Sequence, residues 1–158
     1  RVSGSTVAQN GYVGLYYFPK GGGTQTLDVD TTLATRNTFG MNLSTNQSLA
    51  IPAITIANST ASNNSASGFH VFSSFGRIRF TGNLASHNPL GFDIVGGDNT
   101  IIYLSRNTGL GNQSNGSGFD VLTTKLGSLP SGPNVVTFSN NDFYETNYNG
   151  PVYKHASE

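Results

Sequence analysis

The stretch SHNPLGFDIVGGDNTIIYLSRNTGLGNQSNGSGFDV, Ser86–Val121, contains one short phrase twice. The phrase is Gly-Phe-Asp followed by a β-branched residue, and it begins at Gly91 and again at Gly118, 27 residues later. Related glycine phrases occur along the whole chain, beginning at Gly14, Gly40, Gly68, Gly91, Gly118 and Gly150. The intervals of 26, 28, 23, 27 and 32 residues indicate an internal repeat, with Lys125–Pro133 predicted as a loop inserted in the last unit.

A second phrase, an alternating apolar run closed by asparagine, lies between the glycines. The runs end at Asn58, Asn83, Asn107 and Asn141, and further asparagines follow at Asn63, Asn88, Asn112 and Asn147. Alternation with period two predicts strands, and asparagine is typical of the turns that end them. A helix-free unit of this size predicts one coil of a parallel β-helix. In such a coil Phe69, Phe92 and Phe119 would point inward as one aromatic file, and the recurring glycine would allow a sharp corner or a positive φ.

Two segments resemble the repeats of right-handed β-helix proteins of the pectin-lyase-like superfamily, RIRFTGNLASHNPLGFDIVGG at 77–97 and NTIIYLSRNTGLGNQSNGSGFDVLTT at 99–124. That group includes polysaccharide lyases, epimerases and phage tailspikes. The resemblance implies an all-β, right-handed parallel β-helix, here of about six coils, and a role toward polysaccharide. It covers nearly the whole chain, so we expect residues 1–158 to form one domain, as a fragment or processed part of a longer chain. An antiparallel β-sandwich or jelly roll is the alternative, because many short strands with frequent turns fit it too.

Charge is scarce in this chain. Only 10% of the residues are charged, eight acidic and eight basic, and the formal net charge is zero. This argues against nucleic-acid binding, which needs clustered Lys and Arg, and no apolar run is long enough to insert in a membrane. An abundance of Asn, Gly, Ser and Thr without cysteine predicts an all-β protein that works extracellularly, on a cell surface or on a virion. No cofactor motif or metal-ligand cluster is recognisable.

The third residue of each glycine phrase is expected to point outward. Stacking the coils places these residues in one column, namely Tyr16, Asn42, His70, Asp93, Asp120 and Val152. Neighbouring coils lie ~4.8 Å apart, so the Asp93 and Asp120 carboxylates would come within roughly 5–6 Å of each other, and their repulsion would raise one pKa. That spacing is typical of retaining glycosidases. We therefore predict Asp93, Asp120 and His70 as catalytic residues, with Asn42 and Tyr16 contacting substrate. A solvated ladder is the alternative interpretation. The outward position itself predicts that Asp93→Ala costs almost nothing in stability.

A second column lies on the strand before the first asparagine turn and contains Thr55, Arg79, Tyr103 and Thr137. Arg79 and Tyr103 are predicted to bind an acidic sugar by ion pairing and ring stacking. Solvated surface is again the alternative.

Two function classes follow from these patterns. The first is a polysaccharide-acting module of the lyase, glycosidase, epimerase or tailspike type. The second is a non-catalytic stalk or adhesin domain that binds glycan or partner subunits, so catalysis stays open. The ends of an isolated β-helix are exposed sheet edges, which predicts a homo-oligomer or a longer parent chain that covers them.

Overall fold

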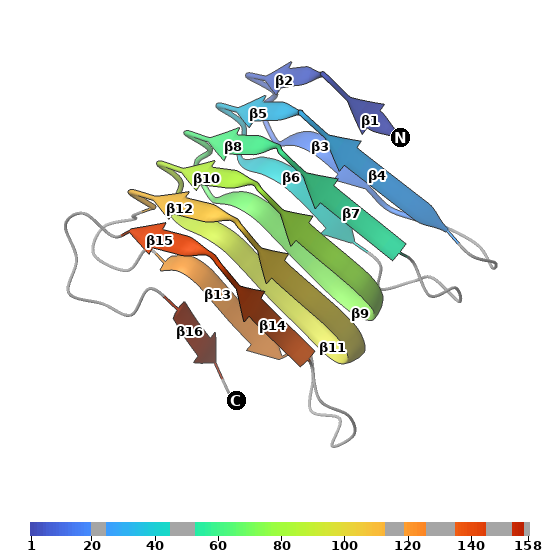
Figure 1. Ribbon diagram of the computed structural model, residues 1–158. Coiled ribbons are helices and arrows are strands. Elements are labelled where there is room, and N and C mark those ends of the chain that lie inside the picture. Colours follow the sequence, from blue (N-terminus) through green and yellow to red (C-terminus); the bar gives the residue numbers. More distant parts are fainter. Residues whose placement is uncertain (20–24, 45–52, 113–118, 126–134, 145–152, 157–158) are drawn as a thin grey trace.

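Successive strands of the computed structural model stack side by side and wind around one core (Figure 1). The structure describes residues 1–19, 25–44, 53–112, 119–125, 135–144 and 153–156. Within these ranges there are strands and turns but no helix. Every strand pair found there is parallel. The predicted parallel β-helix is therefore confirmed, and the antiparallel alternative is wrong.

Three faces make up each circuit of the chain. The first face contains β3 (Val13–Tyr17), β6 (Phe39–Ser44), the first parts of β9 (Ser67–Thr81) and β11 (Leu90–Ser105), β13 (Phe119–Lys125) and β16 (Tyr153–Ala156). The second face contains β1 (Val2–Ser3), β4 (Thr26–Asp30), β7 (Ala53–Ala57), the second parts of β9 and β11, and β14 (Val135–Ser139). The third face contains β2 (Thr6–Ala8), β5 (Leu33–Thr35), β8 (Thr60–Ser62), β10 (Leu84–Ser86), β12 (Thr108–Leu110) and β15 (Asp142–Tyr144). Because β9 and β11 run on from the first face to the second, those two faces form one continuous sheet.

The expected count of about six coils is too high for the closed part of the solenoid. Side chains buried on all three faces come from about three turns, which run from β4 to the first part of β11. The turn formed by β1, β2 and β3 supplies only partly buried apolar residues, because among the described residues it pairs with a coil on one side alone. The glycine phrase therefore overcounts the closed turns, since it also marks the first coil, whose apolar residues are only partly buried.

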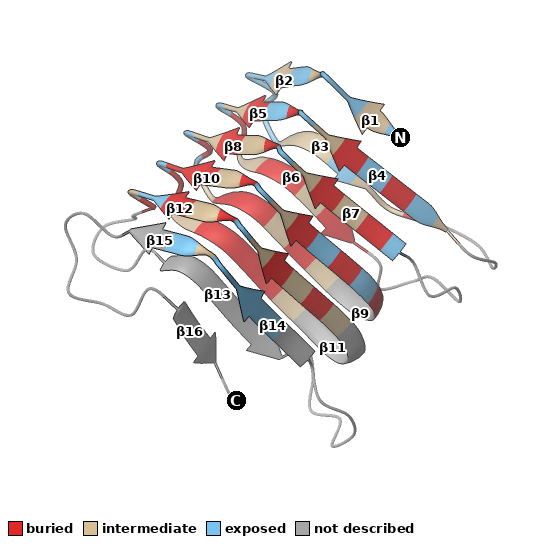
Figure 2. Cartoon of the chain, in the orientation of Figure 1, coloured by how far each residue is buried: buried red, intermediate tan, exposed pale blue. Residues whose placement is uncertain are grey.

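The core is built from inward-facing residues on alternating positions. Figure 2 shows the alternation on the second face, where buried and more exposed positions follow one another along β4 and β7. The rings of Phe69 and Phe92 stack with centroids 4.9 Å apart, and Phe80 meets both rings edge-on. All three side chains are fully buried. The predicted aromatic file is confirmed for Phe69 and Phe92.

The prediction that Phe119 is the third member of that file is wrong. Phe119 pairs with Leu90, and Val121 takes the place opposite Phe92. The second Gly-Phe-Asp phrase is thus displaced by two residues along the sheet. Side chains along a strand alternate between the two faces of the sheet with a period of two. A displacement of two residues therefore changes the partners but keeps each side chain on the same face, so the hydrophobic pattern does not reveal it.

Two asparagine ladders hold the coils together at the corners. In the first, backbone amides donate to the side-chain oxygen of the next coil, from Asn37 to Asn64, from Asn64 to Asn88 and from Asn88 to Asn112. In the second, the amides of Ser59, Asn83 and Asn107 donate to Asn83, Asn107 and Asn141. The side-chain amides donate in turn to carbonyls of the preceding coil, as Asn88 does to Ala61. Buried polar groups at the corners are thereby paired, as a dry core requires.

At the corners, the residue with a positive φ and the residue that forms the ladder are two different residues. Asn58 and Asn63 lie in the left-handed region, with φ of 48° and 54°, and the residue after each makes the ladder contacts. The phrase glycines are needed for another reason. A Cβ on Gly40 would lie 2.6 Å from the carbonyl oxygen of Gly68 and 2.8 Å from the ladder amide of Asn64. Close approach between coils, and not a positive φ, therefore explains the glycine at this position.

Candidate functional site

The outward column of the first face is assembled as predicted over four coils. The backbone pairs Tyr16 with Asn42, Asn42 with His70, and His70 with Asp93. After Asp93 the column departs from the prediction, because the next positions belong to Leu122 and Lys154.

The predicted pair of carboxylates is consequently not supported by the register. Asp120 stands two positions before Leu122, the residue opposite Asp93. The cause is the displaced second phrase, which moves the aspartate out of the column. The Asp120 side chain and Val152 lie outside the described part of the structure.

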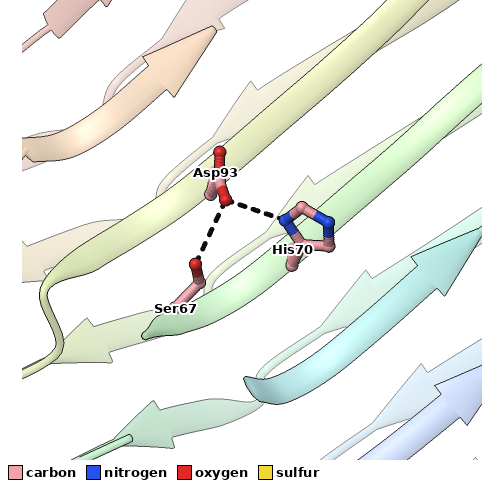
Figure 3. Close-up of polar contacts among 3 residues, drawn as sticks. All are labelled: Ser67, His70 and Asp93. Carbon is pink, nitrogen blue, oxygen red and sulfur yellow. Dashed lines mark hydrogen bonds and ion pairs between the residues drawn. The ribbon is translucent and has the colours of Figure 1, made fainter. Parts of the chain in front are cut away.

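Asp93 instead belongs to a compact polar cluster with two residues of β9. Its Oδ2 lies 2.8 Å from His70 Nδ1 and accepts a hydrogen bond of 3.2 Å from Ser67 Oγ. Figure 3 shows the three side chains converging from neighbouring coils. The side chains of His70 and Asp93 are 16% and 12% exposed, so the aspartate is more buried than the outward, solvent-facing position predicted from the sequence.

This contact fixes the orientation of the His70 ring. A carboxylate only accepts hydrogen bonds, so Nδ1 carries the proton that points to Asp93. Nε2 has no hydrogen-bond partner among the described residues. The arrangement leaves this nitrogen as the group available to a ligand. Ser67 bonds to the carboxylate and not to the imidazole, so the three residues do not form a serine nucleophile with its base.

Aromatic rings lie beside the cluster on the same face. The Phe39 ring lies 5.1 Å from the His70 ring, and Tyr12 meets Phe39 edge-on at 5.6 Å. Tyr16 stacks on Phe18 at 6.0 Å with the planes 10° apart. Tyr12 and Tyr16 are 66% and 57% exposed. Sequence reasoning found Tyr16 but missed Tyr12 and Phe39, whose only signal is their position just before the corner glycine of each coil.

The second face carries the other predicted column. Asp28, Thr55, Arg79, Tyr103 and Thr137 occupy equivalent positions on β4, β7, β9, β11 and β14. The Arg79 guanidinium lies over the Tyr103 ring, 5.3 Å from its centroid. The two predicted binding residues are therefore brought together, in the geometry of a cation–π contact.

An open depression of about 430 Å³ surrounds this pair. It is lined by Ala53, Ile54, Thr55, Arg77, Ile78, Arg79 and Tyr103. A smaller depression of about 180 Å³ continues on the other side of the pair, beside Ser105, Thr137 and Ser139. Arg77 was missed by sequence reasoning, although it lies two positions before Arg79 and thus on the same side of the strand.

The side chains of Arg77 and Arg79 are both exposed. Neither Arg77 nor Arg79 forms an ion pair with any residue that the structure describes. The closest acidic position in their columns is Asp28, two coils from Arg79. The depression therefore presents uncompensated positive charge beside an aromatic ring.

Within the described ranges, no three His, Cys, Asp or Glu side chains gather in a way that would hold a metal ion. In that same part of the chain no helix is long and apolar enough to cross a membrane.

A family described as the right-handed β-helix region matches residues 1–108. The chain belongs to this family. The resemblance of its repeats to right-handed β-helix proteins is thereby confirmed. No curated protein and no solved structure matches the chain, so within the right-handed β-helix region family its ligand must be inferred from its own side chains.

Proposed function

We propose that this right-handed β-helix protein is a glycan-binding module that works outside the cell or on a virion, and that its second face takes acidic sugar units. The observation that carries the proposal is the depression around Arg77, Arg79 and Tyr103, in which a tyrosine ring lies beside two guanidinium groups that form no ion pair with a described residue.

The chemistry of these groups matches a uronate or another carboxylated pyranose. A guanidinium offers two parallel N–H donors to a carboxylate, and the pair is stronger and more directional than one with lysine. A tyrosine ring offers a flat apolar surface to the C–H face of a sugar and a hydroxyl at its edge. Thr55, Ser105 and Thr137 line the two depressions and add hydroxyl groups that exchange hydrogen bonds with a sugar.

The distribution of charge favours a glycan over a nucleic acid. The chain has eight basic residues, balanced by eight acidic ones, and two of the basic side chains line the depression. A nucleic-acid surface needs a broad basic patch, because each bound phosphate contributes to affinity through counterion release. Two arginines suit a short acidic segment of a polysaccharide.

The experiment measures binding of oligogalacturonate and oligomannuronate, with the uncharged methyl ester of each as a comparison, by calorimetry. We expect acidic oligomers to bind and Arg79→Gln to weaken binding by roughly tenfold or more, since a charged hydrogen bond contributes about 1.5–3 kcal/mol. Arg1→Gln is the matched control, because it removes the same charge from an exposed site outside the depression. Equal affinity for acid and ester, or equal losses in the two variants, would refute the proposal.

A further inference from the structure

We infer that the first face carries a second glycan subsite, for a neutral pyranose, formed by the exposed ring of Tyr16, the ring of Phe39 and the Nε2 atom of His70. The inference rests on the proposed role in glycan binding, but it concerns a different surface and a different sugar chemistry from the arginine depression.

The aromatic part of the subsite is exposed where apolar rings are normally covered. Tyr16 is 57% exposed, and its ring is held parallel to that of Phe18. Tyr12 is 66% exposed and is held against Phe39, which in turn contacts His70. These contacts restrict the rings before any ligand arrives, so little side-chain entropy remains to be lost on binding. The apolar face of a pyranose is a suitable partner for rings held in this way.

The polar part of the subsite is the imidazole of His70. Asp93 holds Nδ1 at 2.8 Å, and Ser67 donates to the same carboxylate oxygen, so the ring cannot easily rotate away. Nε2 remains without a partner in the described structure. A hydroxyl both donates and accepts hydrogen bonds, so a sugar can pair with Nε2 whether or not that nitrogen carries a proton.

Asn42 lies between the two parts of the subsite. It follows Tyr16 and precedes His70 in the paired column, so the three positions span two coil spacings, about 10 Å. Its Oδ1 is buried without a hydrogen-bond partner in the described structure. An unpaired buried acceptor is costly, and a turn of the amide toward a bound hydroxyl would relieve that cost.

The composition of β3 and β6, the strands that carry Tyr16 and Phe39, favours a neutral sugar. Strands β3 and β6 contain no charged residue, and the carboxylate of Asp93 is already engaged by His70 and Ser67. An acidic sugar lying along these two strands would meet no guanidinium or ammonium group on them.

The experiment titrates the full chain with neutral tetrasaccharides of glucose, galactose, mannose and N-acetylglucosamine, followed by amide chemical shifts and calorimetry. We expect at least one to bind, with shifts concentrated in β3, β6 and the first part of β9. Tyr16→Ala and His70→Gln should each lower its affinity by roughly tenfold, and Tyr16→Phe should change it by less than about twofold. The matched controls are Leu110→Ala and His87→Gln, which alter exposed residues elsewhere.

The outcomes separate this inference from the proposed function. Loss of neutral binding in Tyr16→Ala and His70→Gln, with both controls unchanged, supports the subsite. Failure of every neutral tetrasaccharide to bind, shifts confined to other strands, or self-association that Tyr16→Ala abolishes would overturn it. Binding of acidic oligomers through Arg79 is measured separately, so either surface can fail while the other stands.

Discussion

Truncation of Phe92 to alanine tests the inward file on which the arrangement of the outer faces depends. The ring is fully buried, stacks on Phe69 at 4.9 Å and meets Phe80 at 5.5 Å. Its neighbours are held by coils above and below, so the space left by the ring cannot collapse completely. We therefore expect the full cost of a Phe→Ala change in a core, about 3–5 kcal/mol of the free energy of unfolding. For a chain of 158 residues that loss lowers Tm by roughly 6–20 °C.

The assay is urea unfolding followed by circular dichroism, with Tyr16→Ala as the matched control. Tyr16 is a large aromatic residue one coil from the closed core and is 57% exposed, so its removal should cost less than about 0.5 kcal/mol. The slope of free energy against urea should stay the same in all three proteins, because the surface exposed on unfolding hardly changes. Equal losses in the two variants would mean that the assignment of inner and outer positions is wrong.

Three further predictions concern backbone approach, the polar cluster and pH. Gly40→Ala should destabilise by about 1–3 kcal/mol, because its Cβ would meet the carbonyl of the next coil at 2.6 Å; Gly11→Ala, where nothing lies within 4 Å, is the control. Asp93→Ala should cost about 1–3 kcal/mol in urea unfolding, because His70 and a serine lose their acceptor, whereas the sequence alone suggested no loss. Burial raises the pKa of Tyr17 above its ordinary value of 10.0, so the unfolded chain loses that proton first. Stability should be intact below about pH 10 and fall as pH rises above it, and Tyr17→Phe should make the fall shallower.

The inner positions could be predicted from the sequence because every coil repeats them. Phe69 and Phe92 stack as the glycine phrase indicated, since the two phrases pair in register on neighbouring strands. The outer column is also correct from Tyr16 to Asp93. Residues that occupy equivalent places in successive coils are related by the repeat alone, and no knowledge of distant contacts is needed.

The displacement of Asp120 shows where this reasoning fails. Alignment on the phrase assumes that every glycine occupies the same position in the register of the sheet. A phrase can, however, shift by two residues relative to its neighbour without changing the alternation of inward and outward side chains. The register, and with it the predicted acid pair, is then decided by the packing of each coil on the last. The sequence identified the phrase glycine, but the reason predicted for it, a sharp corner or a positive φ, does not apply at Gly40. Its close contact with the carbonyl of the neighbouring coil exists only once the coils are stacked.

Only part of the candidate site could be predicted from the sequence, because some of its contacts also depend on how the coils stack. Ser67 and Phe39 stand before corner glycines, outside the strict alternation that identifies outward residues. Their contacts with Asp93 and His70 cross from one coil to the next. Arg77 does follow the alternation and could have been predicted from the sequence, because it precedes Arg79 by two positions on the same strand.

The geometry of the solenoid connects its faces to the kind of ligand they suit. Inward positions are constrained by stacking, so differences in function must reside in the outward residues, which a parallel β-helix repeats about every 4.8 Å along straight lines. One such line carries Thr55, Arg79, Tyr103 and Thr137, and another carries Tyr16, Asn42, His70 and Asp93. A linear polymer can contact several members of such a line at once, and each contact then increases the local concentration for the next. A small compact ligand gains nothing from this repetition. If affinity for an acidic or neutral oligosaccharide rises with each added sugar until the line is filled, the repeat contributes to binding; if a monosaccharide binds as tightly as a tetrasaccharide, it does not.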